Sequence, residues 1–507
     1  MLPLNQVSLP CNLEYSLPKN DPVFTLVELC NQLDYTKLYR SYIRHWRKYS
    51  PTILFKIIVY GYMRRIYSSR QLEEACNRDI CFMWLLQDEP APDHSTIARF
   101  QDERLAYAME DLFYQLIIKL HELGEVKFEN MFVDGTKIEA NANRYTFVWA
   151  KAVKKNMDKL TTKTEMLFSS LCDIYAVDCD TPEELYENLV LRASELNIEF
   201  VYGRGKRKNQ LQRDIENLGE LLERKYKYID YLDKLGHRNS FSKTDVDATF
   251  MRMKDDHMMN GQLKPGYNAQ IGVESEYIIG VGLFPNPTDV QTLIPFLNRV
   301  QTRIKRKIAN VIADAGYESE ENYTYLAENN QGCYIKPQNY EISKKRKYKN
   351  NKFRVEHMEY DKDNDYYTCA YGKRLEYRYD IKSKSANGYT IIKKVYANES
   401  CEGCPYQGQC HKSKRGYRSI KISQIFMEQR KRSRENIMSD IGIILRKNRS
   451  IQVEGAFGVI KEDYGFRRFL MRGRMKTELQ FFLITFAYDI KKYFNRKNTD
   501  RLNKDLF

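Results

Sequence analysis

The stretch GYNAQIGVESEYIIGVGLFPNPTDVQTLIPFLNRVQTRIKRKIANVIADAGYESEENYTYLAENNQGCYIKP (residues 266–337) decides the fold. Its first half contains two apolar segments of strand character, residues 266–273 and 277–283. A break at Asn286-Pro287 follows, and the spacing of apolar residues then predicts an amphipathic helix over 290–304. This half therefore predicts two strands followed by a helix.

The second half of the stretch repeats the alternation. Residues 311–316 form a short apolar strand that ends in Asp314, residues 318–328 have helical character, and residues 332–337 again read as a strand. Two strands, a helix, a strand, a helix and a strand predict an α/β fold with a mixed sheet.

Acidic residues mark the ends of two predicted strands. Asp134 closes the apolar run that starts at Phe128, just as Asp314 closes its own run, and each is followed closely by a glycine. Functional groups are displayed at strand ends of an α/β sheet. Glu454 is a third candidate, because it lies beside an apolar helical stripe that would pack on the sheet. The stripe consists of Val453, Phe457, Ile460 and Tyr464.

Three carboxylates at one sheet edge would repel one another unless a cation held them, and hard divalent cations prefer oxygen ligands. Two such ions about 4 Å apart can activate a water or a 3′-hydroxyl and stabilise the leaving oxygen of a phosphodiester. Taken singly, an Asp at a strand end is usually a turn residue and a helical Glu is usually solvated. From the residues alone, both interpretations stay open.

The positive charge is concentrated towards the end of the chain. The net charge is +15 over 507 residues, and residues 411–507 hold 24 Lys and Arg against 10 Asp and Glu. A second basic cluster, residues 344–354, is interleaved with Tyr348 and Phe353. Lys and Arg that neutralise phosphates release counterions, so this pattern favours nucleic-acid binding. The alternative is a solvated basic surface that maintains solubility.

Composition excludes several classes of protein. Hydrophobic residues make up 42% and aromatic residues 13%, which argues against wholesale disorder. The longest apolar runs, residues 55–60 and 481–488, are too short for a membrane span, and residues 1–10 lack the pattern of a secretory signal. We therefore expect a soluble cytoplasmic protein without a membrane partner.

Two helical regions precede and interrupt the α/β pattern. Pro51 is expected to start a helix, and Asp93 lies in a capping segment ahead of another. These short helices suit a DNA-docking module or a scaffold bundle equally well. Residues 151–237 predict a helical hairpin or coiled-coil arm, most simply a structural insertion. Its apolar positions are Leu211, Ile215, Leu218, Leu222, Ile229 and Leu232.

Four of the 11 cysteines form a spaced set. They are Cys369, Cys401, Cys404 and Cys410, and His411 is adjacent to the last. Thiolates two residues apart can chelate Zn²⁺ tetrahedrally, although the longer final spacing is less typical of zinc sites. A structural zinc ion, reduced structural thiols and redox chemistry are the three interpretations. An odd number of cysteines and no visible signal argue against a disulfide framework.

A series of motifs, in order, resembles the DDE transposases of bacterial insertion sequences, which have a ribonuclease H-like catalytic domain. The resemblance covers most of the chain, from an InsH-type N-terminal helical domain that starts near Ser50. The motifs are Pro92-Asp93-His94-Ser95-Thr96-Ile97-Ala98-Arg99-Phe100, Val133-Asp134-Gly135-Thr136-Lys137, Thr244-Asp245-Val246-Asp247-Ala248, Pro265-Gly266-Tyr267-Asn268-Ala269-Gln270, Ala313-Asp314-Ala315-Gly316-Tyr317, Val453-Glu454-Gly455-Ala456-Phe457-Gly458-Val459-Ile460-Lys461, Phe466-Arg467-Arg468 and Arg472-Gly473.

The resemblance implies that Asp134, Asp314 and Glu454 are catalytic and ligate two ions of Mg²⁺ or Mn²⁺. It also implies that Lys461 contacts DNA near the cut. Further DNA contacts are expected from Arg446, Arg449, Arg467, Arg468 and Arg472. Asp245 and Asp247 are expected to be structural.

The chain departs from the family pattern ahead of the Glu motif. Related enzymes often carry Tyr and Arg seven and four residues before the Glu. Lys447 and Ser450 stand at those positions here, so Arg446 and Arg449 each lie one residue off the pattern.

We expect a ribonuclease H-like mixed-sheet catalytic core with an N-terminal all-helical domain, a helical insertion and a β-leaning Cys-bearing insertion. The expected divisions are an N-terminal segment (1–44), a helical domain (45–125), a catalytic core (126–150, 238–340 and 425–495), the helical insertion (151–237), the Cys-bearing insertion (341–424) and a basic tail (496–507).

The expected activity is metal-dependent hydrolysis of phosphodiesters at the ends of an insertion sequence, followed by strand transfer into target DNA. Expected partners are double-stranded DNA, with its terminal inverted repeats and target sites, and a second copy of the chain in a homodimer assembled on DNA near the nucleoid. A domesticated, non-catalytic DNA-binding relative and a structure-specific nuclease without strand transfer are the alternatives.

Overall fold

The computed structural model describes residues 17–42, 49–87, 89–203, 205–253, 261–413 and 416–504. The chain forms two compact units. The first comprises Met1–Ile138, Asn268–Phe469 and Met475–Phe507, and the second comprises Glu139–Tyr267 and Leu470–Arg474. Within the described ranges, no helix is both long and apolar enough to span a membrane.

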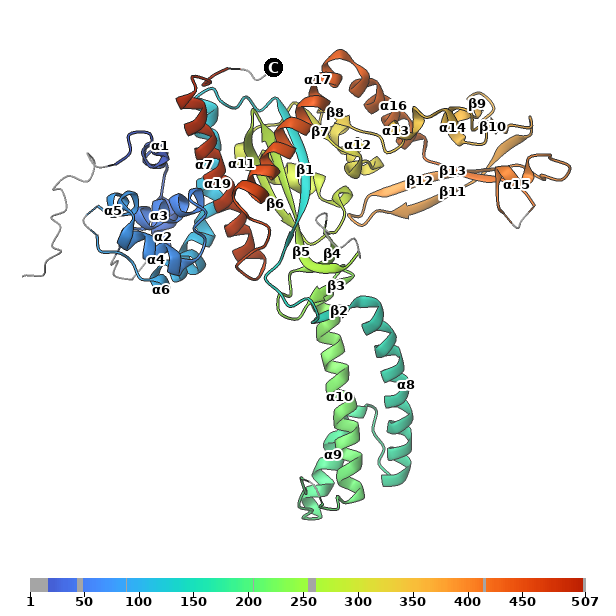
Figure 1. The fold of residues 1–507 in the computed structure, drawn as a ribbon. Helices are drawn as coiled ribbons and strands as arrows, with labels where there is room; N and C mark the ends of the chain where they lie inside the picture. Colours follow the sequence, from blue (N-terminus) through green and yellow to red (C-terminus); the bar gives the residue numbers. More distant parts are fainter. Residues whose placement is uncertain are drawn as a thin grey trace, which may run out of the picture. The chain divides into compact units, whose positions relative to one another are not determined.

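A mixed β-sheet forms the centre of the first unit (Figure 1). Its strands run in the order β5-β1-β7-β8, with β6 paired antiparallel to β5. β1 and β8 both lie parallel to β7. The bounds are β1 Asn130–Glu139, β5 Leu263–Glu274, β6 Tyr277–Phe284, β7 Asn310–Ala313 and β8 Gly332–Ile335. The predicted α/β fold with a mixed sheet is confirmed.

The strands form because their apolar residues are buried on both faces, as is typical of parallel strands. Val133, Ile271 and Val311 are fully buried. Helices α11 (Leu293–Ile304) and α12 (Glu320–Glu328) contact edge strands β6 and β8 respectively. Both fall within the stretches that the sequence predicts to be helical.

Helix α19 (Arg474–Asn498) joins the N-terminal helices to the core. Its middle is buried on every side, which explains the unbroken apolar run in the sequence. The ring of Phe486 lies 5.4 Å from that of Phe55 on α3 (Pro51–Met63). The ring of Phe482 lies 5.2 Å from that of Phe113 on α7 (Ala106–Glu122). Two N-terminal helices, α3 and α7, therefore pack against α19 through aromatic contacts.

The N-terminal helices begin where the capping residues predict. Pro51 occupies the first turn of α3, and the Asp93 side chain accepts a hydrogen bond of 2.8 Å from the Thr96 backbone N–H at the start of α6. The other helices of this region are α1 Pro22–Cys30, α2 Thr36–Arg40, α4 Ser69–Arg78, α5 Ile80–Leu86 and α6 His94–Phe100.

A second, antiparallel sheet contains the strands that follow α14 (Arg346–Lys349). Its strand order is β13-β12-β11-β10-β9, and β11 and β12 form a long two-stranded ribbon (Figure 1). The bounds are β9 Glu359–Asp361, β10 Tyr366–Thr368, β11 Arg374–Lys384, β12 Thr390–Ala397 and β13 Ser419–Ile422. Tyr367, Leu375 and Tyr396 pack in its small core. The β character predicted for this region is present.

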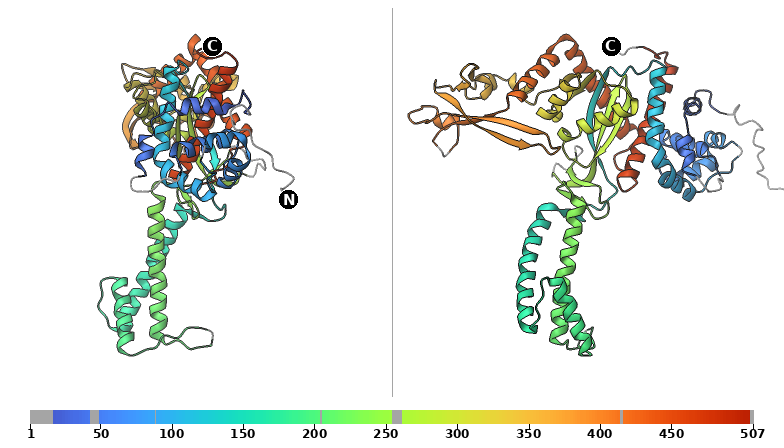
Figure 2. Two further views of the ribbon diagram at one scale, coloured as in Figure 1. Left: turned by 90° about the vertical axis from the view of Figure 1, so that its left-hand side faces the viewer. Right: turned by 180° about the vertical axis from the view of Figure 1, so that it is seen from behind.

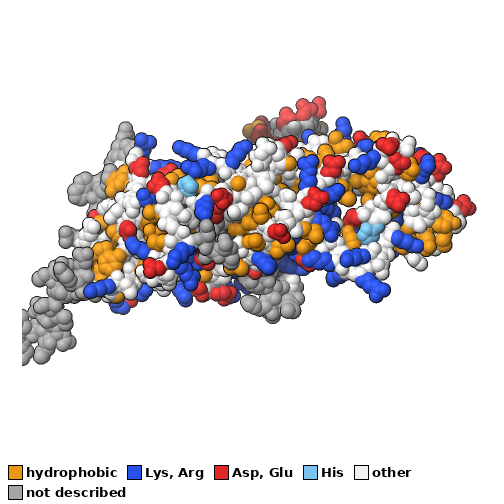
Figure 3. All heavy atoms as spheres, turned by 90° about the horizontal axis from the view of Figure 1, so that it is seen from above, with side chains coloured by type: hydrophobic (Ala, Val, Ile, Leu, Met, Phe, Trp, Pro, Cys, Tyr) orange, Lys and Arg blue, Asp and Glu red, His pale blue; other side chains and the backbone are white. Residues whose placement is uncertain are grey.

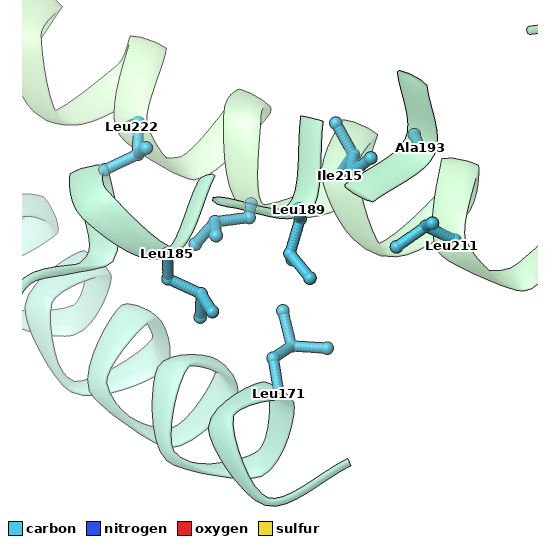
Figure 4. Close-up of a cluster of buried hydrophobic side chains, with 8 residues drawn as sticks. Leu171, Leu185, Leu189, Ala193, Leu211, Ile215 and Leu222 are labelled. Atoms are coloured by element: carbon cyan, nitrogen blue, oxygen red, sulfur yellow. The ribbon is translucent and has the colours of Figure 1, made fainter. Parts of the chain in front are cut away.

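The second unit contains three packed helices, α8 (Ala150–Tyr175), α9 (Pro182–Glu195) and α10 (Gln210–Leu235) (Figure 2). Helices α8 and α10 are antiparallel, and short strands β2 (Phe147–Trp149) and β3 (Ser240–Ser242) pair at their base. Leucine side chains from all three helices fill their common core (Figure 4). Of the predicted apolar positions, Leu211, Ile215, Leu218 and Leu222 lie in this core, whereas Ile229 is 44% exposed. In the same unit, β4 (Thr249–Arg252) pairs antiparallel with the beginning of β5.

Candidate active site

Asp134 and Asp314 lie at the same level on neighbouring parallel strands. The last paired residues of β1 and β7 are Val133 and Ala313, and the two aspartates follow them directly. Neighbouring strands are about 4.8 Å apart, so the two carboxylates share one end of the β1–β7 pair. The Asp134 side chain is 12% exposed, and its Oδ1 accepts 2.7 Å from the Gly135 N–H.

The prediction that the first strand ends at Asp134 is wrong. β1 continues through Glu139, so Asp134 lies within the strand rather than at its end. β7 does end at Ala313, where the Asp314 side chain caps a short 3₁₀ turn by accepting 2.8 Å from the Gly316 N–H. Each strand has a second neighbour, but β8 pairs with β7 only as far as Ala313, whereas β1 continues beside β5.

A fourth acid, Asp289, lies beside both aspartate motifs. Its Oδ1 accepts hydrogen bonds from Asn268 Nδ2 at 2.7 Å and from Gln270 Nε2 at 2.9 Å. A Cβ placed on Gly316 would lie 3.3 Å from Asp289 Oδ2. Sequence reasoning missed this residue, although the Asn286-Pro287 break after a strand was a signal that a functional loop begins there.

The buried Tyr317 hydroxyl lies within the field of these acids and donates a hydrogen bond to Gln270 Oε1. Burial raises the pKa of Tyr317 well above its ordinary value, the negative charges of Asp289, Asp134 and Asp314 raise it further, and Arg449 lowers it. Tyr317 is therefore a neutral hydrogen-bond donor that holds Gln270, and through it Asp289, in place.

Glu454 approaches the site from a helical segment that is interrupted twice. Helix α17 (Asp440–Arg449) runs into a π-helical turn, Ser450–Glu454, followed by α18 (Gly455–Gly458) and a second π-helical turn, Val459–Asp463. The predicted apolar stripe is buried despite these interruptions, with Val453 and Ile460 fully buried. The Glu454 side chain is 65% exposed.

Arg449 links the helix to the sheet. Its Nη1 donates to Asp134 Oδ2 at 3.3 Å, and its Nη2 lies 3.7 Å from Glu454 Oε1. The guanidinium is 16% exposed and lies between the two carboxylates. The structure thus brings together Asp134, Glu454 and Arg449, which are far apart in the sequence.

A basic cavity of about 430 Å³ opens beside Asp314. Arg446, Lys447, Arg449 and Lys336 line it, together with Ser450. The Nε of Arg446 is buried and has no hydrogen-bond partner among the described residues, and its guanidinium lies 5.1 Å from the centre of the Tyr340 ring. Four cations beside a carboxylate make this cavity suited to an anion such as a phosphate.

The remaining predicted DNA contacts are more dispersed. Lys461 lies on the second π-helical turn, and Arg467 and Arg468 are exposed in the loop after it. Arg467 Nη2 pairs with Glu462. Arg472 belongs to the second unit, where its Nε donates 2.8 Å to the Asn141 carbonyl.

Asp245 and Asp247 also belong to the second unit and accept hydrogen bonds there. Asp245 accepts 3.0 Å from the Tyr267 hydroxyl and 3.2 Å from the Gly473 N–H, and Asp247 accepts 2.8 Å from the Arg474 N–H. These bonds are consistent with the structural interpretation of both acids.

The donors of the site fit a hard divalent cation in their chemistry, because Asp134, Asp314 and Glu454 supply carboxylate oxygens and Asp134 and Asp314 are neighbours. Their spacing is wider than a ligand shell. Within the described ranges, no group of three or more His, Cys, Asp or Glu side chains is arranged to hold a metal ion. The Arg449 guanidinium occupies the space between two of the three acids.

The four cysteines singled out in the sequence line one small cavity of about 10 Å³, together with His411. Cys401 Sγ accepts 3.1 Å from Asn398 Nδ2, and the Arg418 guanidinium donates to Cys410 Sγ. The fold gathers these cysteines around one cavity, and two of the four thiols accept hydrogen bonds from amide or guanidinium donors. In the described part of the chain, no three of them are arranged to hold a metal ion.

Two family models match the chain. The family described as Transposase DDE domain matches residues 368–494, and the family described as Transposase domain (DUF772) matches residues 11–103. Neither a curated protein nor a solved structure matches. Both matched families are transposase domains, and they indicate a transposase function for the chain. They also confirm the more particular resemblance to insertion-sequence DDE transposases, a family whose DDE domain implies a ribonuclease H-like core and the use of a divalent metal.

The matched segments cover different parts of the site. The DDE-domain match contains Glu454, Lys461 and the four-cysteine set, whereas Asp134 and Asp314 lie outside both matches. Residues 11–16, 43–48 and 88 of the N-terminal match lie outside the described residues.

Proposed function

We propose that this transposase hydrolyses phosphodiesters at the ends of an insertion sequence and transfers the freed 3′-hydroxyl to target DNA. The observation that carries the proposal is the register of β1 and β7, because Asp134 and Asp314 follow it side by side and Arg449 connects Asp134 to Glu454. Adjacent carboxylates on a rigid sheet are what the positioning of a phosphodiester cleavage site requires.

In this proposal Asp134, Asp314 and Glu454 hold Mg²⁺ or Mn²⁺, two ions, which when bound activate the attacking oxygen and stabilise the leaving one. Other residues of the chain bind the DNA and hold the acidic residues in position. Lys336, Arg446 and Lys447 bind the phosphate backbone from the basic cavity. Tyr317 and Gln270 keep the loop of Asp289 in place behind the aspartates.

The proposed partners are double-stranded DNA, bearing terminal inverted repeats and target sites, and a second copy of the chain in a homodimer formed on DNA. Lys461, Arg467, Arg468 and Arg472 are proposed as additional phosphate contacts. The proposed location is the cytoplasm, at the nucleoid, where such DNA is found.

The proposal is tested with purified full-length protein and a duplex made from the DNA that flanks the reading frame. We expect Mg²⁺-dependent nicking at the element end, followed by joining to a target plasmid. Asp134→Asn and Asp314→Asn should each reduce both steps by at least about 10³-fold, because each removes a ligand charge at the reacting phosphate. Asp440→Asn is the matched control, since Asp440 is exposed on α17, and it should cleave like wild type.

The alternatives give different outcomes. DNA binding without any metal-dependent nicking would identify a non-catalytic relative, and nicking without joining would identify a nuclease. Full cleavage by both aspartate variants would refute the assignment of the acids.

The gathering of Cys369, Cys401, Cys404 and Cys410 around one cavity supports a structural zinc ion as a separate proposal. We expect natively purified protein to contain about one zinc per chain by elemental analysis, and Cys404→Ser to lose most of it. Zinc-free native protein in which all four thiols react with a thiol reagent would instead establish reduced structural cysteines.

A further inference from the structure

The π-helical turn Ser450–Glu454 changes which side chains share a face of the helix. Arg449 and Glu454 are five residues apart, and in a regular α-helix residues at that spacing differ by about 140° around the axis. A π-turn closes with i→i+5 hydrogen bonds, so residues five apart come one above the other. Arg449 thereby faces Glu454 even though it lies one residue off the family's usual spacing.

The resulting contact puts a positive charge between the proposed metal ligands. One guanidinium nitrogen bonds to Asp134 Oδ2 at 3.3 Å and another lies 3.7 Å from Glu454 Oε1. A divalent cation shared by these carboxylates would need the same space and would be repelled by the guanidinium. Arg449 and the cation are therefore competitors.

We propose that Arg449 is a positioning residue with two partners. Without DNA it bridges Asp134 and Glu454 and keeps divalent metal affinity low. When DNA is bound it turns to a backbone phosphate in the basic cavity and leaves the carboxylates to the cation. The inference rests on the proposed function, because it takes Asp134 and Glu454 as metal ligands.

The basic cavity is the proposed binding site for the DNA phosphate, the second partner of Arg449. Arg449 lines it together with Arg446, Lys447 and Lys336, so the guanidinium already borders a space of about 430 Å³ that suits an anion. The buried Arg446 Nε has no hydrogen-bond partner among the described residues, so it is available to donate to a phosphate oxygen. The contact to Glu454 is long and the Glu454 side chain is 65% exposed, so its release costs little.

The test measures metal binding rather than catalysis. Mn²⁺ binding to the full-length protein without DNA is followed by the loss of the free-ion electron paramagnetic resonance signal and by calorimetry. Arg449→Gln should bind Mn²⁺ at least about tenfold more tightly than wild type, because the competing charge is gone. Arg449→Lys should stay close to wild type, because it keeps the charge.

Arg446→Gln is the matched control. This substitution removes one guanidinium from the same helix and the same cavity. In the described part of the chain Arg446 contacts neither Asp134 nor Glu454, so the Mn²⁺ affinity of the variant should stay within about twofold of wild type. If both variants bound Mn²⁺ more tightly by the same factor, the effect would come from the loss of any nearby positive charge, and the proposal would be overturned. Unchanged or weaker Mn²⁺ binding in Arg449→Gln would overturn it as well.

A short DNA duplex provides the second arm. By linkage, DNA that draws Arg449 away must raise the Mn²⁺ affinity of wild type, and Arg449→Gln should lose that coupling. Coupling that persists in Arg449→Gln would contradict the two-partner scheme.

Failure of the proposed function gives a different result. If the double variant Asp134→Asn, Arg449→Gln binds Mn²⁺ as tightly as Arg449→Gln, the ion is not held by Asp134 and the metal assignment itself fails. If binding depends on Asp134 but not on Arg449, the metal site stands and only the competition is refuted.

Discussion

The α-carbon of Gly135 has no room for a side chain. A Cβ at this position would lie 2.1 Å from Gln270 Nε2 and 2.8 Å from Asp289 Oδ1. Gln270 is fully buried and hydrogen-bonded to Tyr317, so it cannot swing away. The glycine after Asp134 is therefore required by the close approach of β5, which no local sequence pattern reveals.

Gly135→Ala should destabilise the protein by about 1–3 kcal/mol, because the methyl group overpacks a buried hydrogen-bonded cluster. Urea unfolding monitored by circular dichroism measures the effect, and DNA nicking should fall with it. Gly458→Ala is the control, since a Cβ there meets nothing within 4 Å and lies in a helical segment. Its midpoint should stay the same or rise slightly. An unchanged midpoint for Gly135→Ala would show that the cluster can move apart.

At the scale of elements, a charged network ties α7 to α11 and α19. Arg299 on α11 donates from Nε to Glu110 at 2.7 Å and from Nη1 to Glu478 at 2.8 Å, and Arg303 also pairs with Glu110. Burial raises the pKa of Glu110, but hydrogen bonds and charges from Arg299 and Arg303 outweigh burial and leave the pKa below its ordinary value of 4.5. A depressed carboxyl pKa means that the ionised form stabilises the fold above pH 4.5 and that this contribution is lost as the pH falls.

Glu110→Gln should cost about 1–3 kcal/mol at pH 7, because Arg303 loses its charged partner and Arg299 keeps only Glu478. The difference from wild type should shrink as the pH falls from 5 towards 3, as wild-type Glu110 becomes protonated too (roughly the range in which such carboxyls titrate). Unfolding midpoints across this range measure it. Glu122→Gln, an exposed change on the same helix, should cost little at any pH. A pH-independent difference for Glu110→Gln would contradict the ion-pair account.

At the scale of the whole molecule, positive charge is abundant, with a net charge of +15. On the face drawn in Figure 3, Lys and Arg side chains are spread among acidic and hydrophobic ones. Residues 411–507 hold the excess, whereas residues 151–237 contain 15 basic and 16 acidic residues. We therefore expect DNA affinity to arise from many separate phosphate contacts contributed mainly by the C-terminal part.

The affinity for non-specific duplex DNA should fall steeply as salt rises, because each phosphate contact releases counterions. Lys461→Gln should reduce the slope of log affinity against log salt by about one, and the control Lys159→Gln, an exposed change on α8, should leave it unchanged. Fluorescence anisotropy at several salt concentrations provides both slopes. A salt-independent affinity, or equal effects of the two variants, would contradict this account of DNA binding.

Much of the architecture follows from local patterns. The alternation of residues 266–337, the helix starts at Pro51 and Asp93 and the buried stripe around Glu454 are all present in the structure, since hydrophobic periodicity and capping act over a few residues. Asp134 and Asp314 could be predicted as candidate acids for the same reason, whereas the residue at which β1 ends could not. The length of β1 depends on its pairing with β5, and β5 is far away in sequence, so a local pattern does not show where β1 ends.

By itself, the sequence determined the mixed α/β class, the three candidate acids and the basic character of the C-terminal part, because each depends on residue type and short-range spacing. Only the tertiary structure decided that Asp134 and Asp314 are level on adjacent strands, that Asp289 joins them and that Arg449 stands between Asp134 and Glu454. Strand register is set by packing across the sheet, and the π-turn that turns Arg449 inward is a change of hydrogen-bond partners that residue spacing does not encode.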